Sequence, residues 1–156
     1  MPIRTPYTPV ALEIATAANH AKMPKGTIGY AIVTADQTPI TTEASLTSLT
    51  VTPVFEASRL YRCEAYVHAS SDTTGDRWRL RIKDAGTTIQ DFRNPDCTAT
   101  LSDTGRVVGY INNGAAGART ITVTLERTAG TGTLTTKAAA TTPATLEVTD
   151  IGPAMV

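Results

Sequence analysis

From Thr27 onward the chain alternates apolar and polar positions with a period of two, which is typical of strands that bury one face. In RLYRCEAYVHAS, residues 59–70, Tyr61, Cys63, Ala65 and Val67 fall on one face and Arg62, Glu64, Tyr66 and His68 on the other. In RTITVTLERT, residues 119–128, the predicted inner positions are Ile121, Val123 and Leu125. The predicted strands cover residues 27–35, 48–55, 59–70, 77–84, 88–94, 106–112, 119–128, 133–140 and 144–151.

Turn-forming residues separate these strands. DAGT at 84–87 and AGTGT at 129–133 each predict a hairpin turn, and the glycine-rich NNGAAGA at 112–118 predicts a flexible hairpin tip. No segment after residue 26 has a helical period. The sequence therefore predicts an all-β fold, an antiparallel β-sandwich or jelly roll of about eight or nine strands.

Residues 1–26 have a different character. They contain four prolines around an alanine-rich stretch, VALEIATAANHAKM, that is close to the length at which an isolated helix is marginal. We interpret 1–26 as an extended or partly helical anchoring arm that gains order on a partner, and 27–156 as the β-sandwich domain. The candidate anchoring residues of the arm are Tyr7, Leu12, Ile14, Asn19 and Met23.

A basic stripe lies in RWRLRIKD, residues 77–84. Trp78, Leu80 and Ile82 are predicted to face the core, which leaves the intervening cations on the outer face. That face either pairs with acidic residues of neighbouring strands, such as Glu64 and Asp91, or meets an anionic partner or another subunit. The stripe consists of Arg77, Arg79, Arg81 and Lys83.

The sequence offers little chemistry for catalysis or metal binding. The two histidines, His20 and His68, belong to no metal-ligand or nucleophile motif, so we expect neither an active site nor a cofactor. Asp72 and Asp76 in SDTTGD lack the spacing of an EF-hand loop, and we interpret them as turn formers in preference to calcium ligands. Accordingly we expect no catalytic, cofactor-binding or metal-binding residues.

Composition limits the partners and the compartment. The 14 basic and 14 acidic side chains cancel, and no aromatic platform accompanies the stripe, so we expect no nucleic-acid partner. The N-terminus lacks the pattern of a signal peptide and no apolar run reaches the length of a membrane span, so we expect a protein made in a cytoplasm without membrane insertion. In that setting Cys63 and Cys97 are predicted to be buried thiols in preference to a disulfide.

Two segments carry a resemblance to a known group of proteins. Residues 15–51 contain a TAA-x-x-N-like stretch followed by P-x-G-x-x-GYA-x-VTA-x-Q-x-x-ITTE-x-x-LT-x-LTV, and residues 125–154 contain R-x-AGTGT, then PA, then DIGPA. These segments resemble short virion structural proteins of tailed bacteriophages, of the minor tail, head-fibre or capsid decoration type, especially in phages of actinobacteria. The match covers about half the chain. Residues 60–115 depart more, and Thr149 stands where an acidic residue is common.

The resemblance implies a β-sandwich that commonly assembles as a homotrimer and is anchored by its arm to capsid or tail protein on the virion surface. A low-charge surface rich in threonine and alanine fits subunits packed against one another. The alternative is a module that binds carbohydrate or a host receptor, with a cell-surface glycan as partner. Tyr66 and Tyr110 are the candidate stacking residues for that alternative. Because residues 60–115 differ most from the phage proteins, we expect specificity for a partner or host to lie in this region.

Overall fold

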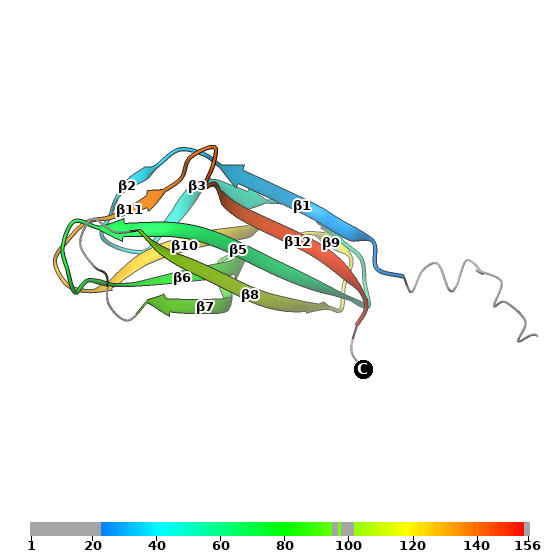
Figure 1. Ribbon diagram of the computed structural model, residues 1–156. Coiled ribbons are helices and arrows are strands. Elements are labelled where there is room, and N and C mark those ends of the chain that lie inside the picture. The colour runs from blue at the N-terminus through cyan, green and yellow to red at the C-terminus, as the bar shows by residue number, and fades with distance from the viewer. Residues whose placement is uncertain (1–22, 95–96, 98–101, 155–156) are drawn as a thin grey trace, which may run out of the picture.

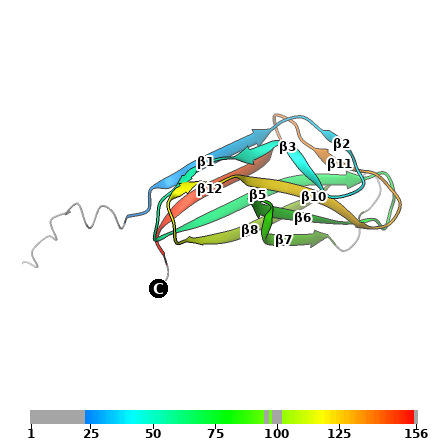
Figure 2. The same cartoon turned by 180° about the vertical axis from the view of Figure 1, so that it is seen from behind.

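Two antiparallel sheets pack face to face in the computed structural model, which describes residues 23–94, 97 and 102–154 (Figures 1 and 2). The described residues are all-β and contain no helix, as the alternation predicted. In this part of the chain no helix is therefore long and apolar enough to cross a membrane. The prediction for the arm, and with it Tyr7, Leu12, Ile14 and Asn19, lies outside the described residues.

The larger sheet has the order β1-β12-β5-β11-β2, and β8 pairs with β5. The smaller sheet has the order β3-β10-β6-β7, and a short pair, β4 and β9, closes one end. The strands of the larger sheet are β1 (Gly26–Val33), β2 (Gln37–Ile40), β5 (Arg59–Ser71), β8 (Asp103–Asn113), β11 (Leu134–Lys137) and β12 (Ala144–Pro153). Those of the smaller sheet are β3 (Ala44–Val51), β6 (Arg77–Asp84), β7 (Thr87–Asn94) and β10 (Ile121–Ala129), and the short pair is β4 (Val54–Phe55) with β9 (Gly117–Ala118).

The core lies between the two sheets and is built from the inner set of alternate positions. Trp78, the single tryptophan of the chain, is fully buried and its ring centroid lies 5.6 Å from that of Phe92. The inner residues predicted on β5, β6 and β10 are all buried, which confirms the period-two interpretation. They are Tyr61, Cys63, Ala65, Val67, Trp78, Leu80, Ile82, Ile121, Val123 and Leu125.

The hairpin predicted at DAGT is confirmed. Strands β6 and β7 pair with Asp84 opposite Thr87, and the two residues between them have positive φ, 45° at Ala85 and 88° at Gly86. Two consecutive positive φ values are the geometry of a type I′ turn, which matches the right-handed twist of the paired strands.

The other two predicted hairpin connections are wrong. AGTGT leads from β10 in the smaller sheet to β11 in the larger one, and residues 114–116 lead from β8 to the short strand β9 and then to β10. Both segments therefore carry the chain between sheets. Turn-forming residues show where a strand ends, but a sandwich also needs such residues wherever the chain changes sheet.

Some strand boundaries also differ from the prediction. The segment 48–55 is divided, because Pro53 cannot donate a ladder hydrogen bond and lies between the end of β3 and the start of β4. The predicted strand 133–140 shortens to β11, and β2 was not predicted because its four residues are too few to show a period.

Candidate functional site

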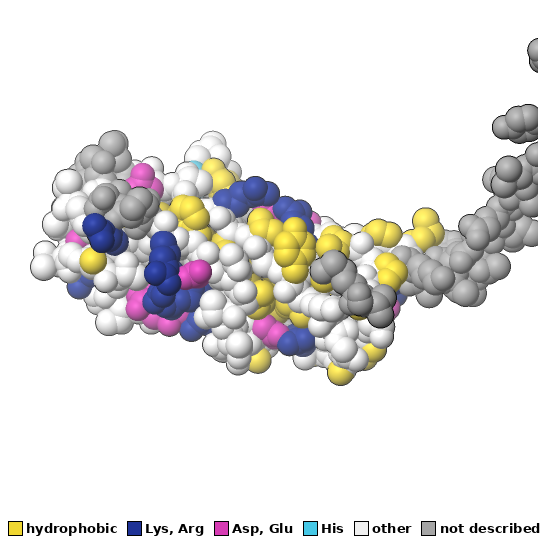
Figure 3. Space-filling model, turned by 90° about the horizontal axis from the view of Figure 1, so that it is seen from below, with side chains coloured by type: hydrophobic (Ala, Val, Ile, Leu, Met, Phe, Trp, Pro, Cys, Tyr) yellow, Lys and Arg dark blue, Asp and Glu magenta, His cyan; other side chains and the backbone are white. Residues whose placement is uncertain are grey.

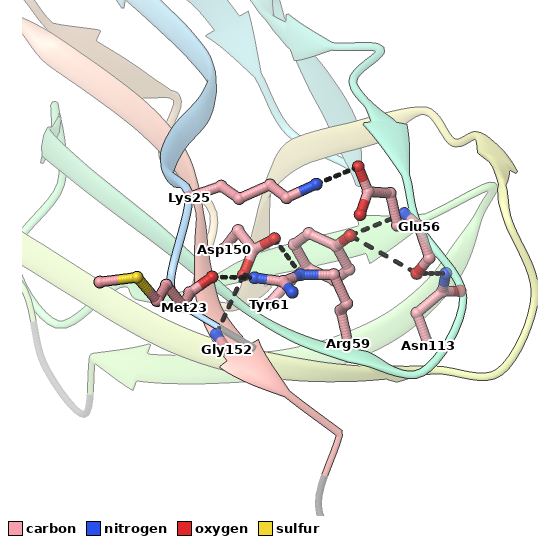
Figure 4. Close-up of polar contacts among 8 residues, drawn as sticks. All are labelled: Met23, Lys25, Glu56, Arg59, Tyr61, Asn113, Asp150 and Gly152. Carbon is pink, nitrogen blue, oxygen red and sulfur yellow. Dashed lines mark hydrogen bonds and ion pairs between the residues drawn. The ribbon is translucent and has the colours of Figure 1, made fainter. Parts of the chain in front are cut away.

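The root of the N-terminal arm is held by a buried ion pair at one end of the sandwich (Figure 4). The guanidinium of Arg59 donates from Nε to Oδ2 of Asp150 at 2.5 Å and from Nη2 to Oδ1 at 2.6 Å. Both side chains are at most 5% exposed. The same Nη2 donates to the carbonyl oxygen of Met23 at 2.6 Å, so the pair also fixes the backbone where the arm meets the sandwich.

Asp150 has a second role in the same cluster. Its Oδ1 accepts a hydrogen bond from the backbone N–H of Gly152 at 2.9 Å, and Gly152 has a φ of 127°, in the region that favours glycine. The hydrogen bond to Asp150 is the main reason that the pKa of Arg59 is raised. The Asp and Gly of the DIGPA motif therefore act together to bind Arg59 and to shape the end of β12.

Neighbouring contacts extend this cluster, which we call the arm root: Met23, Lys25, Glu56, Arg59 and Asp150. Lys25, just before β1, forms an ion pair with Glu56, and the backbone N–H of Glu56 donates to the hydroxyl of Tyr61 at 2.7 Å (Figure 4). Met23, one of the predicted anchoring residues, has an exposed side chain beside this cluster. The arm root thus joins the last residues of the arm to strands β5 and β12 and to the segment between β4 and β5.

Sequence reasoning missed the Arg59–Asp150 pair, although the pattern contained a signal for it. Asp150 has the same parity as the buried Leu146 and Val148 on β12. A charged residue at an inner position of an alternating strand needs a buried partner of opposite charge, because burying it alone is costly. Arg59 has the parity of the buried Tyr61 on β5 and supplies that partner.

The basic stripe on β6 lies beside carboxylates of its two neighbouring strands, β7 and β10, and of the segment that precedes β3. Arg79 and Arg81 each place an Nη2 atom 2.7 Å from Oε2 of Glu126 on β10, and Arg79 also lies 4.0 Å from Asp91 on β7. The prediction that Asp91 pairs with the stripe is confirmed. The prediction for Glu64 is wrong, because Glu64 lies on β5 in the other sheet.

Glu43, between β2 and β3, holds the other end of the stripe. Its Oε1 lies 2.6 Å from both Arg81 and Lys83 and accepts a hydrogen bond from Thr124 at 2.7 Å. Burial alone would raise the pKa of Glu43, but the hydrogen bonds from Lys83, Thr124 and Arg81 outweigh that effect and lower it to about 2. The stripe is therefore part of a network of cross-strand ion pairs, in which Arg79, Arg81 and Lys83 meet Glu43, Asp91 and Glu126.

The two carboxylates of the SDTTGD loop hold the AGTGT segment in place. Asp76 is fully buried, and its Oδ1 accepts hydrogen bonds from the backbone N–H groups of Thr131 at 3.0 Å and Gly132 at 3.3 Å. A Cβ atom at Gly132 would lie 2.5 Å from Oδ2 of Asp76, so the close approach requires glycine. Within the described part of the chain no group of three or more His, Cys, Asp or Glu residues could hold a metal ion.

The side chains of His68, Cys63 and Cys97 were the remaining candidates for a chemical role, and each is involved in packing or hydrogen bonding. His68 Nδ1 lies 3.0 Å from the hydroxyl of Thr104, and the His68 ring packs edge-on against Tyr66. Cys63 and Cys97 are buried and unbonded, as predicted. Burial is the main cause that raises the pKa of Cys63 to about 12 and of Cys97 to about 11, so neither thiol is activated.

The outer faces of the two sheets differ. The outer face of the smaller sheet carries the ion-pair network. The outer face of the larger sheet carries exposed side chains of β1, β5 and β8, namely Tyr30, Ile32, Tyr66 and Tyr110. Seen from below, hydrophobic side chains gather over one half of the molecule, and a dense mixed cluster of basic and acidic side chains lies in the other half (Figure 3).

No protein-family model matches this chain, and no curated protein has a matching sequence. The resemblance to phage virion proteins is therefore supported by no family model and by no curated relative.

Three of the solved structures that match this chain do so with TM-scores below 0.5. The Eiger TNF protein of S. frugiperda matches with a TM-score of 0.49 and 9% identity over 85% of this chain and 97% of that chain. A chain of infectious bursal disease virus, Gx strain, gives a TM-score of 0.41 and 10% identity, with 86% of this chain and 39% of that chain covered. A carbohydrate-binding module of Cellvibrio mixtus lichenase 5A, solved with cellotriose, gives 0.37 and 14%, covering 83% and 92%. At such identities and scores these structures give no information on function.

Proposed function

We propose that this chain is a non-enzymatic structural protein of a tailed-phage virion. In this proposal the arm of residues 1–26 attaches the protein to a capsid or tail protein, and the sandwich, assembled as a homotrimer, is displayed on the particle surface. Three motifs of the resemblance support it, because each of these three has a structural role in the described residues. Glu43 of ITTE pairs with the stripe, AGTGT is held by Asp76, and Asp150 of DIGPA binds Arg59.

The observation that carries the proposal is the arm root. The buried hydrophobic residues of the described chain all lie between Ile40 and Val148, so the sandwich builds its core from residues after the arm. At the same time the backbone of Met23 is tied to Arg59. A fixed backbone at Met23, on a domain whose described core lies after the arm, supports attachment of the protein through its N-terminal segment.

The experiment is to delete residues 1–22, so that the shortened chain begins at the native Met23 and keeps the whole arm root. Purified phage particles that lack the protein are mixed with the full chain or with the shortened chain, and bound protein is measured after sedimentation. The full chain should bind, and the shortened chain should unfold at the same urea concentration but lose particle binding.

A second variant makes the test more specific. In the full chain, Leu12→Ser together with Ile14→Ser removes two apolar anchoring candidates without shortening the arm, and particle binding should fall at least tenfold. Equal binding by the full chain, the shortened chain and this variant would refute attachment through the arm. An unfolded shortened chain would refute the claim that the sandwich is self-sufficient.

A carbohydrate-binding or receptor-binding module is the second candidate, favoured by the exposed rings of Tyr66 and Tyr110. Trp78, by contrast, is fully buried and cannot stack on a sugar. A glycan array distinguishes the two proposals. Binding to one glycan class that is lost in Tyr110→Ala would support the second candidate, and absence of binding across the array would remove it.

A further inference from the structure

We propose that the outer face of the larger sheet, across strands β1, β12, β5 and β8, is the surface through which copies of this chain associate. Figure 1 shows these four strands side by side, and the strand pairing puts their outward side chains in continuous rows. We call this surface the tyrosine face. Its outward residues are Tyr30, Ile32, Arg62, Glu64, Tyr66, Arg106, Val108, Tyr110, Thr145, Glu147 and Thr149.

The apolar content of this face is the first observation. The described residues include six exposed large hydrophobic side chains, and four of them project from the tyrosine face. The register places Tyr30 beside Glu147, and Ile32 beside Thr145, which in turn is opposite Tyr66. Tyr110 lies opposite Arg62 and is 56% exposed. Exposed aromatic side chains gathered on one face are characteristic of interface cores.

The charges of the face favour a second copy over a charged partner. Glu64 forms ion pairs with both Arg62 and Arg106, and Glu147 accepts hydrogen bonds from the hydroxyls of Thr27 and Thr149. Two arginines and two glutamates give this face a net charge of zero. Two such faces therefore carry no net charge repulsion, whereas a strongly basic or acidic partner would meet no surface of opposite net charge.

The size of the face is also sufficient. Four strands about 4.8 Å apart, each seven or more residues long at about 3.3 Å per residue, cover roughly 450–600 Å² in projection. The accessible surface of a face with projecting tyrosines exceeds its projection, so it approaches the ~800 Å² per partner of a standard specific interface. The outer face of the smaller sheet carries six charged residues in its ion-pair network, against four charged residues on the tyrosine face, and charged residues are depleted at interface cores.

Two identical faces in contact give a twofold pair, so this inference describes a contact different from those that close the proposed homotrimer, and it does not depend on the virion. The test uses the purified full chain alone, by size-exclusion chromatography with light scattering at 50 µM (roughly 0.8 mg/ml). The wild-type chain should elute as a multiple of its 16.4 kDa mass. The double variant Ile32→Arg with Tyr110→Arg should elute at the mass of one chain, because two cations on each copy would repel across the interface.

Val54→Arg is the matched control, because Val54 is a similarly exposed hydrophobic residue, 70% exposed, on β4, outside the tyrosine face. It should leave the mass of the assembly unchanged. Trp78 fluorescence during urea unfolding checks that each variant is folded. If the double variant does not fold, the single variant Tyr30→Arg is measured in its place.

Two outcomes would overturn the inference: a wild-type chain of single mass, or a folded double variant with the wild-type mass. Neither would affect the particle-binding result for the arm, so the two proposals fail separately. A single-mass wild-type chain that binds a glycan through Tyr110 would instead assign the tyrosine face to carbohydrate.

Discussion

Replacing Glu43 with glutamine should destabilise the sandwich in a way that depends on pH. One carboxylate oxygen of Glu43 forms ion pairs with Arg81 and Lys83 and accepts a hydrogen bond from Thr124. The pKa of Glu43 is about 2, below the ordinary value of 4.5. At about 1.4 kcal/mol per pH unit that difference corresponds to roughly 3 kcal/mol. The side chain is 31% exposed, so screening by water reduces the expected contribution to about 1–2 kcal/mol.

The direction of the pH dependence follows from the lowered pKa. Because the carboxyl group of Glu43 is more acidic in the folded chain than in the unfolded chain, its contribution is fully present above about pH 4.5 and is lost as the pH falls toward 2. Glu43→Gln should therefore lower the free energy of unfolding by about 1–2 kcal/mol at pH 7. At pH 3 the difference from the wild-type chain should be less than half as large.

The assay is urea unfolding followed by the fluorescence of Trp78, the single and fully buried tryptophan. Glu56→Gln is the control, because its pair with Lys25 is about half exposed and such surface pairs contribute little. A loss for Glu43→Gln that is the same at pH 7 and pH 3, or no loss at pH 7, would refute the interpretation of the stripe as an ion-pair network that stabilises the fold.

Three further predictions concern the interior. Asp150→Ala leaves the buried guanidinium of Arg59 without its carboxylate and should cost about 3–5 kcal/mol in urea unfolding; a loss below about 1 kcal/mol would contradict the buried pair. Gly132→Ala should cost about 1–3 kcal/mol, because its Cβ would collide with a buried carboxylate, whereas Gly114→Ala, with open space around it, should be nearly neutral by the same measurement. The Cys63 thiol should resist iodoacetamide at pH 8 until the chain is unfolded, and rapid labelling of the folded protein, read by mass spectrometry, would contradict its burial.

The alternation of apolar and polar side chains predicted the features that depend on residues close together in sequence. The inner faces of β5, β6 and β10 and the hairpin at 84–87 follow from period two and from turn chemistry, both of which depend on residues close together in sequence. The all-β class follows from the same evidence, because no helical period competes with it.

Features that depend on residues far apart in sequence were not predicted. AGTGT has the composition of a hairpin turn, but its conformation is set by Asp76, more than fifty residues earlier, and the chain there changes sheet. The roles of Glu43 and Asp150 likewise depend on ion pairs with Arg81 and Arg59, which are far away in sequence. A charge at an inner position, as at Asp150, shows that a buried partner must exist, but only the strand order identifies it.

The central claim, that this chain is displayed on a virion, is tested most directly by immunogold electron microscopy of the phage that encodes it. The proposed function predicts gold on intact particles, over the head for a decoration protein or at the tail for a tail protein. Particles without label, from a lysate in which the protein is abundant and free, would contradict the claim.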